Sequence, residues 1–194
     1  SNLIVDVGGG TSETALISMG GVVALEAVRV GSFDLDVAIQ NFIKKEFGVA
    51  IGERTAEEIK LTIGSASEYE VELRAEVRGR HISSGLPEVV VFSPSEIREA
   101  IEEPVSTMVD SVTSCLSKAP PEMAQDIIVQ GISLVGGGSL LKGFDKRLSE
   151  ETDVPVHIVP NALEAVVLGA GRCIESFESV RAMFMEDPNA RQRR

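Results

Sequence analysis

The sequence predicts an α/β protein, and two observations carry this prediction. The last third of the chain alternates helical and strand patterns, an order typical of parallel strands covered by helices. Residues 3–30 instead contain three short apolar stretches separated by glycine turns, which indicates an antiparallel meander. A chain of 194 residues is long enough for one or two compact units.

The meander comes first along the chain. We predict strands over residues 3–7, 14–18 and 22–30. Gly8-Gly9-Gly10 ends the first strand, and a Gly-Gly pair lies between the last two. Tight turns between antiparallel strands need residues that reach positive φ, which glycine does at little cost.

An amphipathic helix is predicted next. Leu35, Ile39, Ile43 and Phe47 recur every four residues, which places them on one face of a helix. Gly48 follows directly and is a typical left-handed residue at a helix end. We therefore expect the helix to end there.

A capping-box pattern predicts a second, shorter helix. Thr55 and Glu58 are spaced so that each side chain bonds one otherwise free backbone N–H at a helix start. The helix is expected over residues 56–63.

Two strands of a small sheet and a long helix are expected after it. Apolar and charged residues alternate over 70–78, and 89–92 is a β-branched run. Residues 93–96, Ser-Pro-Ser-Glu, supply an N-cap, a proline in the first turn and a capping acid. Helical spacing then continues to Leu116, with a bend expected at Pro104.

The last part of the chain supplies the alternating elements. We expect a helix at 121–130, a strand at 132–135, a helix at 140–151, a strand at 156–159 and a helix at 162–177. Residues 178–194 are polar and end in a basic cluster, so we predict a disordered tail.

Composition excludes several classes of function. The formal charge of -12 and the pI near 4.7 would repel a phosphate backbone, so we expect no nucleic-acid binding. No apolar run approaches the roughly 20 residues that span a bilayer, and no signal peptide is evident, so we expect a cytoplasmic protein. Cys115 and Cys173 lack metal-ligand spacing and are expected to be reduced thiols.

Asp6 and residues 8–11, Gly-Gly-Gly-Thr, form the first candidate site. The run lies between two strands and lacks the Gly-Lys-Ser/Thr end of a P-loop; Glu13 stands where a dinucleotide fingerprint needs its third glycine. Its glycines allow a ligand to approach and leave N–H groups pointing one way, as in an anion nest. Asp6 would hold Mg²⁺ through its waters, and Thr11 would bond phosphate. A hairpin turn without a ligand is the alternative.

Residues 136–139, Gly-Gly-Gly-Ser, form the second candidate site. They lie between a predicted strand and a predicted helix, whose N-terminus would offer free N–H groups and a partial positive charge to an anion. Tight packing of a strand against a helix also selects glycine, which is the alternative explanation. Two such turns, each leaving a strand of the same layer, favour a phosphate ligand.

Together the two turns resemble the second phosphate loop and the adenosine loop of the actin, Hsp70 and sugar-kinase superfamily. Within it, residues 51–60, 76–80, 120–122 and 131–138 resemble the MreB family of bacterial actin homologues. The similarity extends over residues 3–173 and corresponds to the C-terminal half of that family.

The resemblance implies which residues contact a nucleotide. Gly8, Gly9, Gly10 and Thr11 would contact the β- and γ-phosphates; Glu57 and Lys60 the ribose or adenine; and Gly136, Gly137, Gly138 and Ser139 the α-phosphate and adenosine. Considered without the resemblance, Glu57 and Lys60 belong to a solvated helix face.

The resemblance also implies architecture and cofactors. Residues 1–31 with 92–177 would form a larger, RNase H-like subdomain of the actin type, and residues 32–91 a smaller α+β subdomain inserted into it. ATP and Mg²⁺ would be the cofactors of the intact protein.

The implied function is that of a cytoskeletal protein. Such a protein would bind ATP, assemble head to tail into filaments, maintain cell shape beneath the membrane and work with the cell-wall-synthesis machinery. In the family, the first phosphate loop, the catalytic carboxylate and the membrane-associating segment belong to an N-terminal half, which would be the partner of this chain. The alternatives are a sugar or acetate kinase and an Hsp70-type ATPase module.

No catalytic residue is therefore assigned in this chain. Phosphoryl transfer depends on groups placed on both sides of the phosphates. We expect the intact family member to be a slow ATPase and this half alone to show no meaningful turnover.

Overall fold

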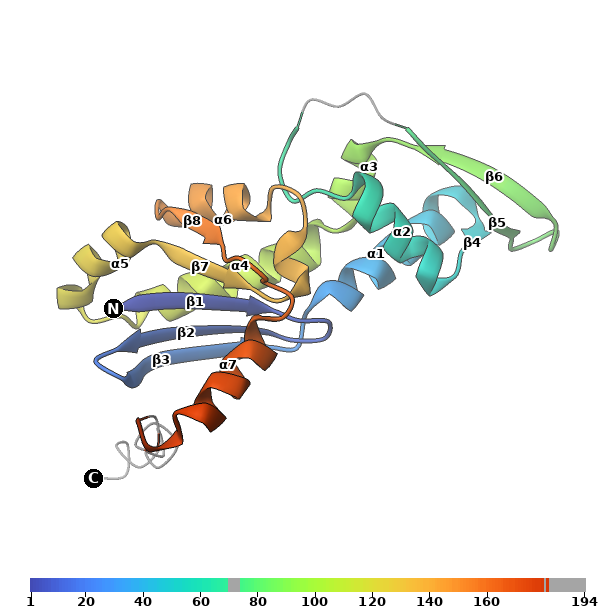
Figure 1. Ribbon diagram of the computed structural model, residues 1–194. Helices are drawn as coiled ribbons and strands as arrows, with labels where there is room; N and C mark the ends of the chain where they lie inside the picture. Colours follow the sequence, from blue (N-terminus) through green and yellow to red (C-terminus); the bar gives the residue numbers. More distant parts are fainter. Residues whose placement is uncertain (70–73, 180, 182–194) are drawn as a thin grey trace, which may run out of the picture.

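A computed structural model of the chain describes residues 1–69, 74–179 and 181. Its strands form two sheets, which Figure 1 shows at opposite ends of the molecule. The five-stranded sheet has the order β3-β2-β1-β7-β8 and consists of β1 (Asn2–Val7), β2 (Ser12–Ser18), β3 (Gly21–Val28), β7 (Ile132–Val135) and β8 (Val156–Ile158). The three-stranded sheet has the order β4-β5-β6 and consists of β4 (Val49–Ala50), β5 (Ala75–His81) and β6 (Pro87–Phe92).

The five-stranded sheet joins the predicted meander to the predicted parallel layer. β1, β2 and β3 pair antiparallel in sequence order. β7 pairs parallel to β1, and β8 parallel to β7. Both predictions are confirmed, and β1 is the strand that the two patterns share.

Helices cover the two sheets. They are α1 (Ser32–Phe47), α2 (Glu53–Ile63), α3 (Pro94–Ala100), α4 (Glu102–Ser117), α5 (Ala124–Gln130), α6 (Phe144–Thr152) and α7 (Ala165–Glu175), with short 3-10 helices η1 (Pro121–Met123) and η2 (Gly137–Leu140). Two local signals are confirmed. α1 ends at Gly48 with φ 66°, and α3 begins with a capping box formed by Ser93 and Glu96.

Two predictions about helix ends are wrong. α2 begins three residues before the expected position, because Gly52 adopts an extended conformation and its carbonyl accepts a hydrogen bond from Ala56 N–H at 3.1 Å. Thr55 therefore lies inside the first turn and caps nothing. The long helix expected up to Leu116 is two helices, and the break lies at Ile101. Pro104 lies in the first turn of α4, where backbone N–H groups have no partner within the helix, so its missing N–H costs no hydrogen bond and causes no bend.

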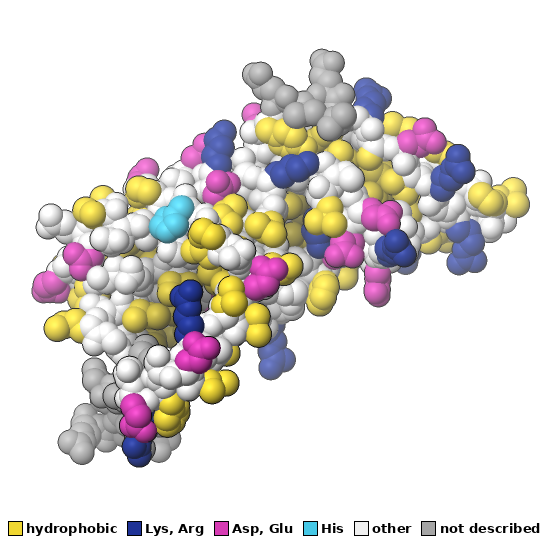
Figure 2. All heavy atoms as spheres, in the orientation of Figure 1, with side chains coloured by type: hydrophobic (Ala, Val, Ile, Leu, Met, Phe, Trp, Pro, Cys, Tyr) yellow, Lys and Arg dark blue, Asp and Glu magenta, His cyan; other side chains and the backbone are white. Residues whose placement is uncertain are grey.

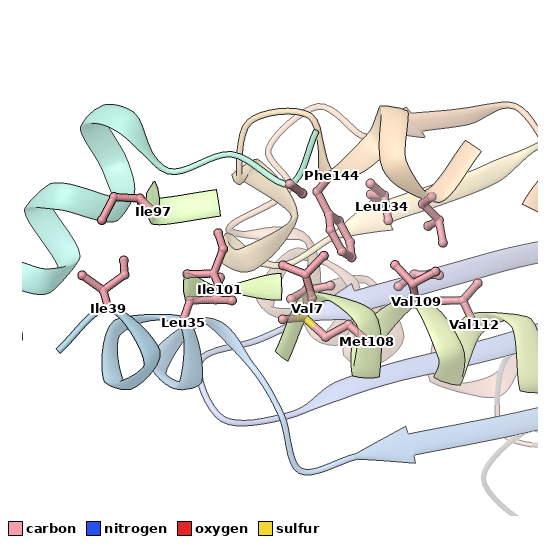
Figure 3. Packing of buried hydrophobic residues seen from close by; sticks show 14 of the residues in the cluster. Val7, Leu35, Ile39, Ile97, Ile101, Met108, Val109, Val112, Leu134 and Phe144 are labelled. Atoms are coloured by element: carbon pink, nitrogen blue, oxygen red, sulfur yellow. The ribbon is translucent and has the colours of Figure 1, made fainter. Parts of the chain in front are cut away.

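One buried apolar cluster runs between the two sheets. Figure 3 shows Leu35 and Ile39 of α1 beside Ile97 and Ile101, with Val7 of β1 reaching the same cluster. Each fully buried aliphatic side chain of this size contributes roughly 1.5–3 kcal/mol. The core thereby fixes α1 relative to the end of β1, where the first candidate site lies.

α7 is packed differently from the other helices, because none of its described residues is buried. Apolar side chains are exposed along α7, which lies at the lower end of the view in Figure 2. They belong to Val166, Val167, Leu168 and Ile174. Large apolar side chains left in water favour association with another surface.

Several predictions lie partly outside the described residues. Positions 70–73 of the strand expected at 70–78 are outside them, and its second part is β5. Most of the tail expected at 178–194 is also outside. The two subdomains expected from residues 1–31 with 92–177 and from residues 32–91 stay a prediction. Among the described residues, no helix is long and apolar enough to cross a membrane.

Candidate functional site

The parallel pairing of β1 with β7 brings the two glycine turns together. Asp6 pairs with Val135, so each turn leaves the sheet at the same edge. The second turn packs closely against the end of β1, directly before the first turn. A Cβ on Gly136 would overlap the Asp6 carboxylate and the Val7 carbonyl, and a Cβ on Gly138 would overlap the Val7 side chain. Glycine is therefore required at both positions for this packing.

The first glycine turn, residues 8–11, is held by the start of α1. The Gly8 carbonyl accepts a hydrogen bond from Ser32 N–H at 3.0 Å, and the Gly9 carbonyl accepts one from Phe33 N–H at 2.8 Å. The described peptide bonds contain no cis bond, and in a trans peptide the carbonyl and the following N–H point in opposite directions. The N–H groups of Gly9 and Gly10 therefore point away from α1.

These N–H groups are available to a ligand. Those of Gly9, Gly10 and Thr11 have no hydrogen-bond acceptor within the part of the chain that the structure describes. Gly10 and Thr11 are exposed, and a Cβ built on Gly10 would meet no atom within 4 Å. Consecutive unpaired N–H groups beside open space are typical of an anion nest.

Gly31 is a site residue that the sequence did not indicate. A Cβ at this position would lie 2.5 Å from the Gly9 carbonyl oxygen. Its N–H donates to the Asp34 carboxylate at 2.7 Å, which fixes the first turn of α1. Gly31 thus allows α1 to approach the glycine turn, and no sequence pattern marks it because Gly9 is distant along the chain.

The second glycine turn, residues 136–139, does not open an α-helix, so that prediction is wrong. It forms the 3-10 helix η2, and α6 begins later, after Gly143. Gly136 has φ 83° and ψ 159°, a conformation reserved for glycine, and its N–H donates to the Ala162 carbonyl at 2.8 Å. The geometry favours a glycine-specific turn over a helix N-terminus.

Some hydrogen-bond donors of the second turn bond within the turn itself, and others have no partner. The hydroxyl of Ser139 is buried and donates to the Gly136 carbonyl at 2.7 Å, so it stabilises the turn itself. The N–H groups of Gly137 and Gly138 have no acceptor among the described residues. Of the two, Gly137 is exposed. The N–H of exposed Gly137 is thus the donor that is open to a ligand, and the N–H of buried Gly138 is a second unpaired donor beside it.

Asp6 lies at the end of β1, opposite Glu13 of β2. Burial and, to a smaller extent, the charge of Glu13 raise the pKa of the Asp6 carboxyl above its ordinary value. Among the described residues no cation pairs with Asp6. A carboxylate in this situation is a place where a bound cation lowers the free energy.

Glu57 and Lys60 of α2 differ in their environment. Glu57 is exposed, as expected, whereas the side chain of Lys60 is only 8% exposed, so the solvated position predicted for it is wrong. The Lys60 ammonium lies 2.9 Å from the carboxylate of Asp36 and 3.0 Å from the carbonyl of Ser32. Asp36 on α1, a partner that no local pattern indicates, accounts for the burial.

Lys60 is connected to the first glycine turn through Ser32. The Ser32 carbonyl accepts from Lys60, and the Ser32 N–H donates to Gly8. The structure thus groups Asp6, both glycine turns and Lys60 around the ends of β1 and β7. Within the described residues there is no cluster of three or more His, Cys, Asp or Glu side chains that would hold a metal alone.

Comparison with known proteins identifies the family. A family model described as MreB/Mbl protein matches residues 1–182. The cell shape-determining protein MreB of Escherichia coli (strain K12) is 42% identical over 177 residues, which are 91% of this chain and 51% of that protein. The cell shape-determining protein Mbl of Bacillus subtilis (strain 168) is 37% identical over 179 residues, 92% of this chain and 54% of that protein. The chain spans about half the length of these relatives.

A solved structure confirms the predicted fold class. MreB5 of Spiroplasma citri, bound to AMPPNP, is 35% identical and superposes with a TM-score of 0.86, covering 92% of this chain and 54% of that chain. The chain thus has the actin-type α/β architecture, with the two glycine turns at the edge of its larger sheet. From the family model and these identities together, the chain belongs to the MreB/Mbl family.

Proposed function

We propose that the two glycine turns form one wall of an ATP-binding site. The observation that carries the proposal is the pair of turns at the adjacent ends of β1 and β7, in which the N–H groups of Gly9, Gly10, Thr11, Gly137 and Gly138 have no acceptor among the described residues. Backbone N–H groups in such turns bind phosphate oxygens without needing a basic side chain. The structure of the MreB5 relative, which was solved with AMPPNP, supports a nucleotide as the ligand.

Asp6 fits a role at Mg²⁺. Mg²⁺ usually takes one or two carboxylates and completes its shell with water and phosphate oxygens. Asp6 lies opposite Glu13 on the neighbouring strand β2, and among the described residues no cationic side chain pairs with it. We propose that Asp6 holds the ion through water, where the ion would neutralise phosphate charge.

Glu57 and Lys60 contribute to the same site in different ways. Glu57 is exposed on α2 and would contact the ribose or adenine directly. Lys60 already bonds Asp36 and Ser32, so we propose that it acts on the nucleotide mainly by holding α1 and the first glycine turn in place. Ser139 likewise supports the second turn.

At the level of the whole protein, we propose a filament-forming cytoskeletal role in cell shape. The cell shape-determining relatives support this role, and the family assignment favours it over a sugar kinase, an acetate kinase or an Hsp70-type module. The other wall of the nucleotide site would come from the N-terminal half of the same protein. The exposed apolar side chains of α7 support such a partner.

The same reasoning covers location and partners. We propose a cytoplasmic, membrane-proximal protein that assembles head to tail with copies of itself and works with the cell-wall-synthesis machinery. Contact with the membrane would come from segments outside this chain.

Sedimentation of the full-length protein tests the proposal. Gly10→Asp places a carboxylate in the open space beside the free N–H groups, where it competes with phosphate. Gly52→Asp is the matched control, because a Cβ there also meets no atom within 4 Å and aspartate suits the N-cap of α2. We expect ATP-dependent pelleting of the wild type and the control and its loss in Gly10→Asp. Equal pelleting of all three proteins would refute the proposal.

A further inference from the structure

A segment after α2 crosses to the loop that follows the second glycine turn, as Figure 1 shows between the end of α2 and the start of α6. Ser65 forms a parallel bridge with Lys142, and Ala66 N–H donates to the Lys142 carbonyl at 2.8 Å. Ser65 and Ala66 are both buried. We call residues 64–67 the strap.

The loop is shaped to receive the strap. Gly143 has φ 69°, and a Cβ there would overlap the side chain of Ser67. Position 143 thus requires glycine for two reasons: its backbone is left-handed, and a side chain there would overlap Ser67. The strap and the loop therefore fit at the level of the backbone.

Lys142 adds a side-chain contact to the end of α2. Its ammonium donates to the Thr62 carbonyl at 2.5 Å and lies 5.8 Å from the centroid of the Tyr69 ring. Thr62 lies in the last turn of α2, where unpaired carbonyls carry partial negative charge, so a cation there is favourable. Lys142 is consequently attached to the strap through its backbone and to α2 through its side chain.

These contacts connect α2 to both glycine turns. Lys142 follows Ser139 by three residues, so it ties α2 to the second turn. At the other side of α2, Lys60 bonds the Ser32 carbonyl, and Ser32 holds Gly8 of the first turn.

We propose that Lys142 is a positioning residue, which sets the distance between α2 and the second glycine turn and thereby the width of the adenosine side of the nucleotide site. This inference rests on the proposed nucleotide site. Lys142 needs no contact with the nucleotide for this role. Its removal changes binding of the adenosine part and leaves binding of the phosphates, because the first glycine turn is held by α1.

A comparison of two ligands separates this role from a general effect on folding. In the full-length protein, Lys142→Met keeps the aliphatic stem and removes the ammonium. We expect its affinity for Mg·ADP to fall roughly two- to five-fold, the range for one cation at a helix C-terminus, and its affinity for tripolyphosphate to stay unchanged. Lys142→Arg should restore Mg·ADP affinity. Lys146→Met is the control, because Lys146 is an exposed lysine of α6 that pairs only with Glu150 among the described residues.

Hydrogen exchange supplies a readout that does not involve a nucleotide. The Ala66 amide should exchange faster in Lys142→Met than in the wild type and the Lys146→Met control. If Lys142→Met leaves both affinities unchanged, or lowers them equally, the ratio of the two affinities stays the same and the positioning role is overturned. If the wild type binds neither ligand, the proposal of a nucleotide site is wrong, and the positioning role of Lys142, which rests on that site, is wrong as well.

Discussion

The buried pair of Asp36 and Lys60 gives the sharpest prediction about stability. Their side chains are 10% and 8% exposed, and the ammonium lies 2.9 Å from the carboxylate. Asp36→Ala would leave the Lys60 ammonium buried with only the Ser32 carbonyl as a partner among the described residues. Breaking one side of a buried pair costs about 3–5 kcal/mol. At roughly 2–4 °C per kcal/mol for a chain of this size, the melting temperature should fall by about 6–20 °C.

Removing the lysine of this pair should cost less stability than removing the aspartate. Burial raises the pKa of the Asp36 carboxyl, and Lys60 opposes that rise. In Lys60→Met the carboxyl pKa rises further, and Asp36 can take up a proton and become neutral. The Asp36→Leu, Lys60→Met double variant should recover much of the stability, because apolar side chains of similar size replace a buried pair at little cost.

Urea unfolding of the three variants, followed by circular dichroism at pH 7, measures these differences. Arg54→Ala is the control, because the exposed pair of Arg54 and Glu58 should contribute no more than about 1 kcal/mol. The reasoning is refuted if Asp36→Ala costs less than about 1 kcal/mol, or if the double variant is less stable than both single variants.

Three further predictions concern the site. Gly31→Ala should lower nucleotide affinity at least ten-fold in equilibrium titrations of the full-length protein, because its Cβ would lie 2.5 Å from the Gly9 oxygen; an affinity equal to that of Gly52→Ala would count against the packing argument. Asp6→Asn should raise the melting temperature at pH 7, since the ionised carboxylate is unfavourable in the folded chain. The gain should begin to shrink as the pH falls through the raised pKa of Asp6 and should vanish below the ordinary pKa of an aspartate, where the carboxyl is neutral in the folded and the unfolded chain. A lower melting temperature at pH 7 would contradict this. The isolated chain should release no phosphate from ATP above background in a malachite-green assay, because the groups that position the attacking water would, in the proposed site, come from the N-terminal half of the protein; steady release would show that the chemistry is complete.

Local sequence signals predicted those features that depend on neighbouring residues. Gly48 and Ser93 define the ends of α1 and α3 as expected, because a left-handed stop and a capping box involve only a few consecutive positions. The order of strands also predicted that the two glycine turns leave strands of the same layer, which the pairing of Asp6 with Val135 confirms.

Contacts between distant segments could not be predicted in this way. Lys60 appeared solvated because its partner Asp36 lies 24 residues away on another helix. The role of Gly31 depends on the carbonyl of Gly9, which tertiary packing alone brings near. The strap was missed for the same reason, since the bridge between Ser65 and Lys142 has no counterpart in either local pattern.

A competing local signal explains the remaining errors. Thr55 and Glu58 satisfied the capping-box spacing, but Gly52 starts the helix earlier and leaves Thr55 in its first turn. After the second glycine turn, Gly143 begins α6, so the intervening residues form a 3-10 turn instead of the first turn of a helix. Spacing alone does not decide between two possible starts that lie a few residues apart.

Backbone amide NMR of the chain, titrated with Mg·ADP, tests the nucleotide site most directly. We predict that the amide resonances of Gly9, Gly10, Thr11, Gly137 and Gly138 shift most and exchange more slowly with solvent, because their N–H groups would bond the nucleotide. The exposed N-cap residue Gly52 serves as the internal reference. Shifts confined to residues outside the two glycine turns, or none at millimolar nucleotide, would contradict the assignment of these turns as the wall of an ATP site.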